Sequence, residues 1–171
     1  YATSKAWKTV ATWQSATWEE LEGEHHTNET AHHRVVGLVI ETRPERITPH
    51  HAYTLRRLGC TKVQMGIQSL DEHVRKQNNR PTTNAQIQSA FETLRLFGFK
   101  THIHAMVNLL GATPESDKQD YLHLVEGKPF QPDEIKLYPC VLVDGTGLCA
   151  HYQDHTWKPY SEEELIEVLV A

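Results

Sequence analysis

The run Val35-Val-Gly-Leu-Val-Ile-Glu-Thr-Arg-Pro44 is almost continuously apolar and then stops abruptly at polar residues. A short run of this kind is typical of a strand in a parallel sheet, where both faces of the strand are covered. We therefore predict a strand over residues 35–40 that is buried on both faces. Glu41 then follows the carboxyl end of this strand, and parallel sheets bind their ligands at that end.

The same alternation of strand and helix continues along the chain. Further strands are predicted for residues 62–67, 100–107 and 134–138. Helices are predicted for residues 48–58, 84–97 and 113–125, for a short segment after Asp71, and from Ser161 onward. This order implies a parallel sheet with helical crossovers. Four strands are too few to close a barrel of eight, so we expect an α/β fold in the form of a partial (β/α) barrel, incomplete at its N-terminal side.

Short-range signals mark the ends of several of these elements. Thr48-Pro49 is an N-cap and a first helical turn, and Gly59 ends the helix that they begin. Ser161-Glu-Glu-Glu164 has the pattern of a capping box for the last helix. Thr17-Trp-Glu-Glu20 has the same pattern within the polar segment 1–34, which we predict to be a helical or irregular lead-in.

The composition is that of a soluble globular chain with a core of its own. Of the 171 residues, 39% are apolar and 23% are charged. No apolar run approaches the roughly 18 residues that span a bilayer, and no signal peptide is visible, so no membrane partner is expected. The formal net charge of −5 weighs against a main nucleic-acid surface, which is normally basic.

The three cysteines are Cys60, Cys140 and Cys149, an odd number without a C-x-x-C pair. A disulfide framework is therefore not expected, and we expect the protein to reside in the reducing cytoplasm. No metal site is predicted within the chain, because closely spaced thiolates are missing. The twelve histidines include three adjacent pairs, whose side chains point in different directions and make poor chelates.

Polar residues follow the predicted strands. Glu41 follows the first, Gln68 the second and Asn108 the third, and Cys140 lies just beyond the fourth. Since the carboxyl ends of parallel strands share one edge of the sheet, these side chains should converge on one mouth. Each could equally be a turn or cap residue. Glu41 and Gln68 are the stronger ligand candidates, because Glu41 directly follows a fully apolar strand and Gln68 follows the small residue Gly66.

Several segments in a fixed order carry a resemblance to a known family. They are Asn28-Glu-Thr-Ala31, His33-Arg34, Gly37-Leu-Val-Ile-Glu-Thr-Arg-Pro44, Leu58-Gly-Cys-Thr-Lys-Val-Gln-Met-Gly-Ile-Gln-Ser-Leu-Asp71, Ala105-Met-Val-Asn-Leu-Leu-Gly-Ala-Thr-Pro-Glu115, Pro132-Asp-Glu-Ile-Lys-Leu-Tyr-Pro139, Gly145-Thr146 and Lys158-Pro-Tyr-Ser161. Together they resemble the radical S-adenosylmethionine (SAM) domain of the Elongator catalytic subunit family, including its bacterial and archaeal members. The resemblance implies that residues 35–171 are the C-terminal half of a radical SAM barrel.

The resemblance also implies a function. Family members are tRNA uridine acetyltransferases that modify carbon 5 of the wobble uridine with SAM, a 4Fe-4S cluster and acetyl-CoA. The cluster-binding cysteine motif, the strand with the Gly-Gly motif and the acetyltransferase domain are absent from this chain. The cluster ligands and the acetyl-CoA site are thus expected outside it, and the isolated chain is expected to be inactive. Expected partners are tRNA, acetyl-CoA and the rest of its own polypeptide. A homodimer is a further option that the resemblance allows.

Roles at the SAM pocket follow from the same resemblance. The positions matching Glu41 and Gln68 hydrogen-bond the methionine or ribose part of SAM. The position matching Arg80 faces the SAM carboxylate, and the segment around His104 and Asn108 borders the ribose and adenine. A carboxylate and an amide suit the ammonium and hydroxyls of SAM, and a guanidinium forks onto a carboxylate. No residue of the chain is assigned a catalytic role.

Structural roles stay open for the same side chains. Glu41 could pair with Arg43 or Arg34 instead of a ligand. Arg80 could be a solvated arginine at a helix end, and His104 could be a hydrogen-bonded core histidine.

Other residues invite simpler interpretations. Tyr138 is expected to pack its ring and hydrogen-bond its hydroxyl. Cys140 and Cys149 are expected to be bystanders, because no basic neighbour is evident that would lower a thiol pKa.

The chain departs from the family at two loops. Asn79-Arg-Pro-Thr-Thr83 stands where members usually show Asn-Arg-Gly-His-Thr, and Val107-Asn-Leu-Leu-Gly111 stands where Pro-Gly-Leu-Pro-Gly is frequent. Pro81 fixes φ and removes a backbone donor, which leaves the path of the first loop open.

Two other functions compete with this one. A different radical SAM enzyme, such as one acting on a porphyrinogen, would use the same glutamate, glutamine and arginine. A non-catalytic fragment or paralogue would only bind a partner. No motif identifies the residues that contact tRNA. Arg56, Arg57 and Lys62 are candidates for this contact on their positive charge alone.

Overall fold

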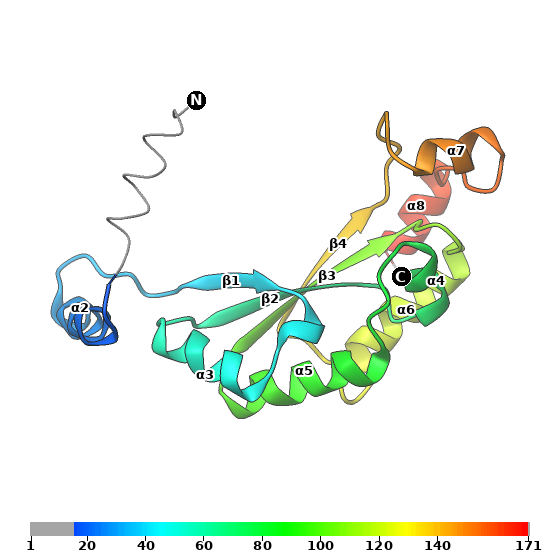
Figure 1. Ribbon diagram of the computed structural model, residues 1–171. Helices are drawn as coiled ribbons and strands as arrows, with labels where there is room; N and C mark the ends of the chain where they lie inside the picture. Colours follow the sequence, from blue (N-terminus) through cyan, green and yellow to red (C-terminus); the bar gives the residue numbers. More distant parts are fainter. Residues whose placement is uncertain (1–15, 171) are drawn as a thin grey trace.

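Four parallel strands form one sheet, in the order in which they occur in the chain. They are β1 (Val39–Thr42), β2 (Lys62–Gln68), β3 (Lys100–Val107) and β4 (Glu134–Pro139). The computed structural model describes residues 16–170, and Figure 1 shows them with the strands running side by side. The alternating α/β order and the sequential parallel sheet confirm the predicted fold class.

Helices connect the strands. They are α2 (Trp18–Thr30), the 3-10 turn η1 (Pro44–Arg46), α3 (Pro49–Arg57), α4 (Glu72–Gln77), α5 (Asn84–Leu96), α6 (Pro114–Glu126), α7 (Leu148–Gln153) and α8 (Glu162–Leu169). The predicted caps are confirmed at Thr17, Thr48 and Ser161, and Asp71 and Thr113 cap α4 and α6. Each of the five side chains accepts a hydrogen bond from a backbone amide in the first helical turn. η1 and α7 were not predicted.

One face of the sheet is covered and the other is open. Val63, Met65 and Ile67 of β2 are at most 2% exposed and pack in the core with residues of α5 such as Phe91. Figure 1 shows α3 and α5 along this face. The alternate residues point the other way, since successive side chains of a strand face opposite sides. This opposite side, the open face, carries Glu41, Gln64, Gly66, His102, His104, Glu134 and Tyr138.

The predicted burial of the first strand on both faces is wrong. β1 begins at Val39, and the side chains of Val35 and Val36 are 72% and 85% exposed. Within residues 16–170, β1 pairs only with β2, and no helix lies over the open face of the sheet. An apolar run is buried on both faces only where two layers cover it, and within the described residues helices cover only one face of this sheet.

The start of β4 is fastened to the start of β3 by Asp133. Its carboxylate accepts hydrogen bonds from the Thr101 amide at 2.8 Å, the Thr101 hydroxyl at 3.0 Å and the Lys100 ammonium at 2.8 Å. Burial alone would raise the pKa of Asp133, but the hydrogen bonds from Lys100 and Thr101 outweigh it and hold the pKa at about 2.

We predict that Asp133→Ala lowers the free energy of unfolding at pH 7 by about 1–2 kcal/mol, since the carboxylate is partly exposed. The folded-state pKa lies below the ordinary value of 3.8, so this stabilisation is complete at neutral pH and is lost as the pH falls through the folded-state value. Urea unfolding at pH 7 and pH 3 measures it. Asp144→Ala, in an exposed loop, is the control and should change neither value; equal effects of Asp133→Ala at both pH values would contradict the prediction.

None of the helices in the described part of the chain combines the length and the apolar character that a membrane span requires.

Candidate functional site

The candidate site lies on the open face, where polar side chains gather over a glycine. A Cβ atom placed on Gly66 would lie 3.0 Å from Nε2 of Gln68 and 4.0 Å from Nη1 of Arg80. In the sheet register, Gly66 of β2 pairs with His104 of β3. Gln68 and Arg80 therefore meet over Gly66, next to His104. We call this group of side chains over Gly66 the Gly66 cradle.

Glu41 completes the group from the neighbouring strand. Its Oε1 lies 3.6 Å from Nδ1 of His104, and its side chain is 62% exposed, which leaves the carboxylate free to accept further hydrogen bonds. The structure thus places four of the five predicted site residues together: Glu41, Gln68, Arg80 and His104. The predicted alternative pairing of Glu41 with Arg43 is not observed, since Arg43 lies against Glu45 at 3.7 Å.

His104 sits among polar groups but is largely shielded from water. Burial lowers the pKa of His104, and the Glu41 carboxylate partly offsets this effect. The imidazole is therefore held toward its neutral form, in which one ring nitrogen accepts a hydrogen bond. Its Nε2 is buried without a hydrogen-bond partner, and the ring stacks edge-on against Tyr138 at 6.0 Å between centroids.

Local backbone features turn the ligand side chains toward the cradle. Gln68 ends β2 with a φ of 72°, at a shift in the register between β2 and β3. Asn79 has a φ of 57°, and the next residue, Arg80, donates its amide to the Arg75 carbonyl at 2.8 Å. Asparagine tolerates this left-handed conformation better than most residues. Sequence patterns alone did not reveal either turn.

Asn108 is not brought to this group. Its backbone N–H donates to Asp117 Oδ2 at 2.7 Å, and its backbone carbonyl accepts from Trp157 Nε1 at 2.9 Å. In the orientation that satisfies its neighbours, the side chain donates to the Lys158 carbonyl at 3.2 Å and accepts from the Tyr160 amide at 2.9 Å. Asn108 therefore anchors the segment that follows α7, and the SAM contact expected for it stays a prediction.

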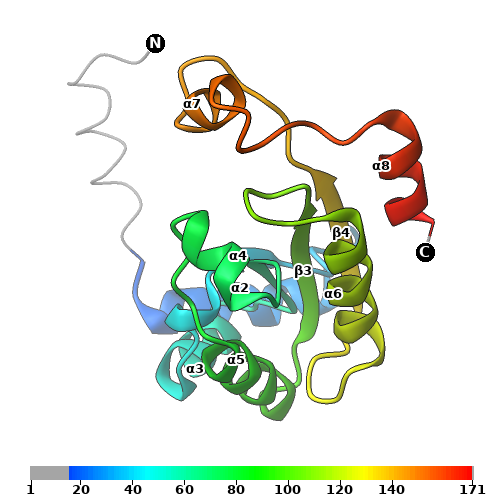
Figure 2. The ribbon, with the colours of Figure 1, turned by 90° about the vertical axis from the view of Figure 1, so that its right-hand side faces the viewer.

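Asp117 is the centre of this anchor. Its Oδ2 also accepts the Tyr160 hydroxyl at 2.7 Å. Burial raises the pKa of Asp117, while the hydrogen bonds from Asn108 and Tyr160 lower it in part. Figure 2 shows the C-terminal helix α8 lying beside α6, the helix that carries Asp117. This role could not be predicted from the sequence, because an aspartate in the first turn of a helix is ordinary.

The three basic residues considered for tRNA contact are all engaged within the chain. Arg56 donates to the carbonyls of Phe97, Cys60 and Gly98 at 2.6–3.0 Å. Arg57 pairs with Glu22 and stacks on the Trp18 ring at 4.1 Å. Lys62 donates to both oxygens of Glu134 at 2.8–2.9 Å.

The cysteines do not form a reactive or metal-binding group. Burial raises the pKa of Cys60 and of Cys140, which disfavours their thiolate forms. No group of three or more His, Cys, Asp or Glu residues in the range 16–170 could hold a metal ion. These residues therefore do not fit a 4Fe-4S cluster, whereas the cradle offers hydrogen-bonding groups suited to a small zwitterion.

Two family models match the chain. The radical SAM superfamily matches residues 15–124, and the radical SAM C-terminal domain matches residues 132–171. Among curated proteins, the chain is 35% identical to the tRNA uridine(34) acetyltransferase of Methanocaldococcus infernus over 151 residues, which cover 88% of this chain and 28% of that protein. It is 32% identical to human Elongator complex protein 3 over 136 residues, which cover 80% of this chain and 25% of that protein.

Solved structures agree with these similarities. An N-terminally deleted archaeal Elp3 from M. infernus matches with a TM-score of 0.80 and 35% identity, over 86% of this chain and 35% of that one. Coproporphyrinogen III oxidase from Escherichia coli matches with a TM-score of 0.64 at 19% identity, over 91% of this chain and 36% of that one, which shows a common fold alone. The chain belongs to the radical SAM superfamily, and the expected resemblance to the Elongator catalytic subunit family is confirmed.

Proposed function

We propose that the chain forms the SAM-binding wall of a cytoplasmic tRNA uridine acetyltransferase of the Elongator type. The chain spans 28% of the length of the M. infernus acetyltransferase, so the remaining parts of the enzyme are proposed to come from elsewhere in the polypeptide. Those parts are the rest of the barrel with the cluster ligands, and an acetyltransferase domain for acetyl-CoA. tRNA is the proposed substrate, with the wobble uridine as the acceptor.

The observation that carries the proposal is the Gly66 cradle. Arg80 brings a guanidinium, Glu41 an exposed carboxylate, and Gln68 an amide that can both donate and accept hydrogen bonds. The methionine part of SAM presents a carboxylate and an ammonium, and its ribose presents two hydroxyls. In the proposed arrangement, Arg80 binds the carboxylate, and Glu41 and Gln68 bind the ammonium or the hydroxyls.

The chain's own contribution is binding and orientation. SAM, when bound together with a reduced cluster, supplies the radical chemistry of this superfamily. The described residues 16–170 offer no cluster site, so we expect no SAM cleavage by this chain alone under reducing conditions. Glu41, Gln68 and Arg80 would fix the methionine end of SAM, and the neutral form of His104 would offer a hydrogen-bonding nitrogen beside them.

The test is SAM binding by the complete, cluster-loaded polypeptide. Arg80→Ala is expected to raise the dissociation constant about tenfold, because a charge-assisted hydrogen bond contributes about 1.5–3 kcal/mol. Arg43→Ala is the matched control, since the Arg43 side chain is 59% exposed and lies 3.7 Å from Glu45, and it should leave SAM binding unchanged. Unaltered affinity in Arg80→Ala, with the same value as the control, would remove the main support for the proposal.

A further inference from the structure

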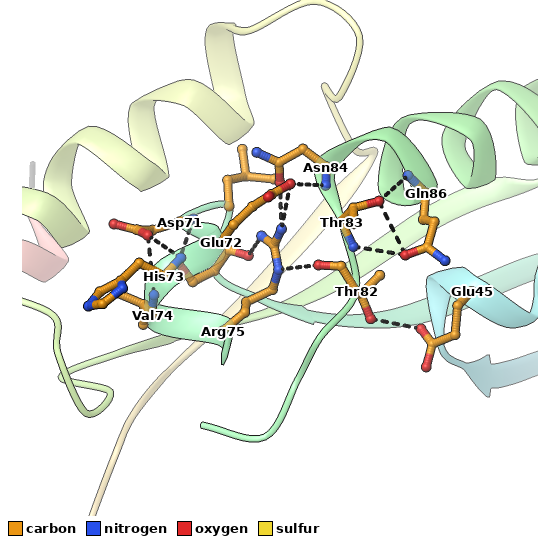
Figure 3. A network of polar contacts seen from close by, with 12 residues as sticks. Glu45, Asp71, Glu72, His73, Val74, Arg75, Thr82, Thr83, Asn84 and Gln86 are labelled. Atoms are coloured by element: carbon orange, nitrogen blue, oxygen red, sulfur yellow. Dashed lines mark hydrogen bonds and ion pairs between the residues drawn. The ribbon is translucent and has the colours of Figure 1, made fainter. Parts of the chain in front are cut away.

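Arg75 is a charged residue buried where α4 meets the core. It is only 1% exposed, whereas arginine side chains in proteins normally lie at the surface. A buried guanidinium is costly unless its donors are satisfied, so its partners show what holds it there. Figure 3 shows these partners gathered around it from several segments of the chain.

The guanidinium joins α4 to two other segments of the chain. It donates to the carbonyl of Ser69 just after β2, to the carbonyl of Thr82 at 2.8 Å and to Oδ1 of Asn84 at 2.7 Å. Glu72 lies 3.7 Å from the same group. A planar guanidinium offers its donors in a fixed fork, so the distances between these three acceptors are set by one rigid unit.

The joined segments carry Gln68 and Arg80 of the Gly66 cradle. Ser69 directly follows Gln68, and Thr82 comes two residues after Arg80. The backbone of Arg75 also holds the loop 79–83 on the N-terminal side of Pro81, since its carbonyl accepts a hydrogen bond from the Arg80 backbone N–H at 2.8 Å. Pro81 between them has no amide to donate. The side chain and the backbone of Arg75 thus clamp both sides of Arg80.

We propose that Arg75 is a positioning residue that fixes Arg80 relative to the end of β2 and thereby sets the recognition of a ligand carboxylate in the cradle. This inference rests on the proposed function, in which Arg80 binds the carboxylate of SAM. Proline at position 81 has no N–H to donate, and the Arg75 side chain holds the loop beside it through the Thr82 carbonyl.

The experiment compares SAM with decarboxylated SAM, an analogue that differs only by lacking the carboxylate. In the complete, cluster-loaded polypeptide, Arg75→Lys keeps the charge but loses the fork. Its dissociation constant for SAM should rise about tenfold, and that for decarboxylated SAM should stay within about twofold. Arg56→Lys is the matched control, because Arg56 also binds three carbonyls but lies at the start of β2 and β3. It should change neither constant.

A purely structural role of Arg75 would weaken both ligands alike, and that result overturns the inference. Should Arg75→Lys not fold, Asn84→Ala gives the same comparison, because it removes one acceptor at the surface of the network. The preference for SAM over the analogue should then fall about two- to threefold, and an unchanged preference overturns the inference.

Arg80→Ala separates this inference from the proposed function. It should abolish the preference for SAM over the analogue, and adding Arg75→Lys should then have no further effect on it. If Arg80→Ala leaves the preference intact, the proposed carboxylate contact is wrong and the positioning role falls with it. If Arg80→Ala abolishes the preference and Arg75→Lys leaves it intact, only the positioning role is wrong.

Discussion

In the Gly66→Val variant, the dissociation constant for SAM is expected to rise about a hundredfold or more, while the fold is kept. The Cβ atom would lie 3.0 Å from Gln68 Nε2 and 4.0 Å from Arg80 Nη1, so we expect two further methyl groups to crowd both side chains. Two hydrogen-bonding side chains would then be displaced together, each worth about 1.5–3 kcal/mol to a charged ligand.

The sheet itself should tolerate the change. Gly66 lies within β2 and is not among the glycines with positive φ, so valine fits its backbone conformation. Valine is favoured in strands, whereas glycine weakens them by roughly 0.5–1 kcal/mol. We therefore expect the free energy of unfolding to change by less than about 1 kcal/mol, with the flexible end of Gln68 moving aside.

Calorimetric titration of the complete, cluster-loaded polypeptide with SAM measures the first effect, and urea unfolding measures the second. Gly66→Ala should give an intermediate loss of about tenfold, because it adds the Cβ without the methyl groups. Gly147→Ala is the control, since a Cβ there meets no atom within 4 Å. Wild-type SAM affinity in a folded Gly66→Val protein would show that the cradle is not the SAM site.

The secondary structure was largely predictable because its signals are local. Thr48-Pro49 and Gly59 bracket α3, and Gly59 adopts the φ of 83° that favours glycine at a helix end. β3 was predicted with the bounds that the structure has. Such caps and periodic patterns act over a few residues, so a single sequence contains them.

Burial of the first strand was not predictable in the same way. The apolar run from Val35 fits a strand covered on both faces, but coverage depends on segments far away in the chain. In residues 16–170, nothing covers the open face or pairs with the outer edge of β1, and Val35 and Val36 stay exposed.

The residues of the candidate site also fall into those that the local sequence predicts and those that depend on the folded chain. Glu41 and Gln68 could be predicted because each is the polar residue at which an apolar run stops. The structure places Glu41 within β1 and Gln68 at the last residue of β2, on neighbouring strands of the parallel sheet. Arg75 could not, because its acceptors are backbone carbonyls of Ser69 and Thr82, whose positions only the folded chain fixes. From the sequence, Glu72 and Arg75 look like an ordinary pair on the surface of a helix.

Replacing Asp117 is expected to have the second large effect, which is a loss of stability. Asp117→Ala is expected to lower the free energy of unfolding by about 2–4 kcal/mol, because the Asn108 amide and the Tyr160 hydroxyl would be left without their acceptor. Asp117→Asn keeps an oxygen at that position and should stay within about 1 kcal/mol of wild type. Urea unfolding at pH 7 compares the three proteins, and equal losses in both variants would contradict the assigned hydrogen bonds.

The same pair of variants has a pH signature. Burial raises the pKa of Asp117 above its ordinary value of 3.8, so the folded state binds this proton more tightly than the unfolded state. The part of the stability that comes from this tighter proton binding is therefore fully present below the unfolded-state pKa and is lost as the pH rises through the folded-state pKa. Asp117→Asn has no such titration. Its stability relative to wild type should thus increase from pH 4 to pH 7, opposite in sign to the acid-sensitive contribution of Asp133, because one carboxyl is buried at an anchor and the other is held charged by Lys100.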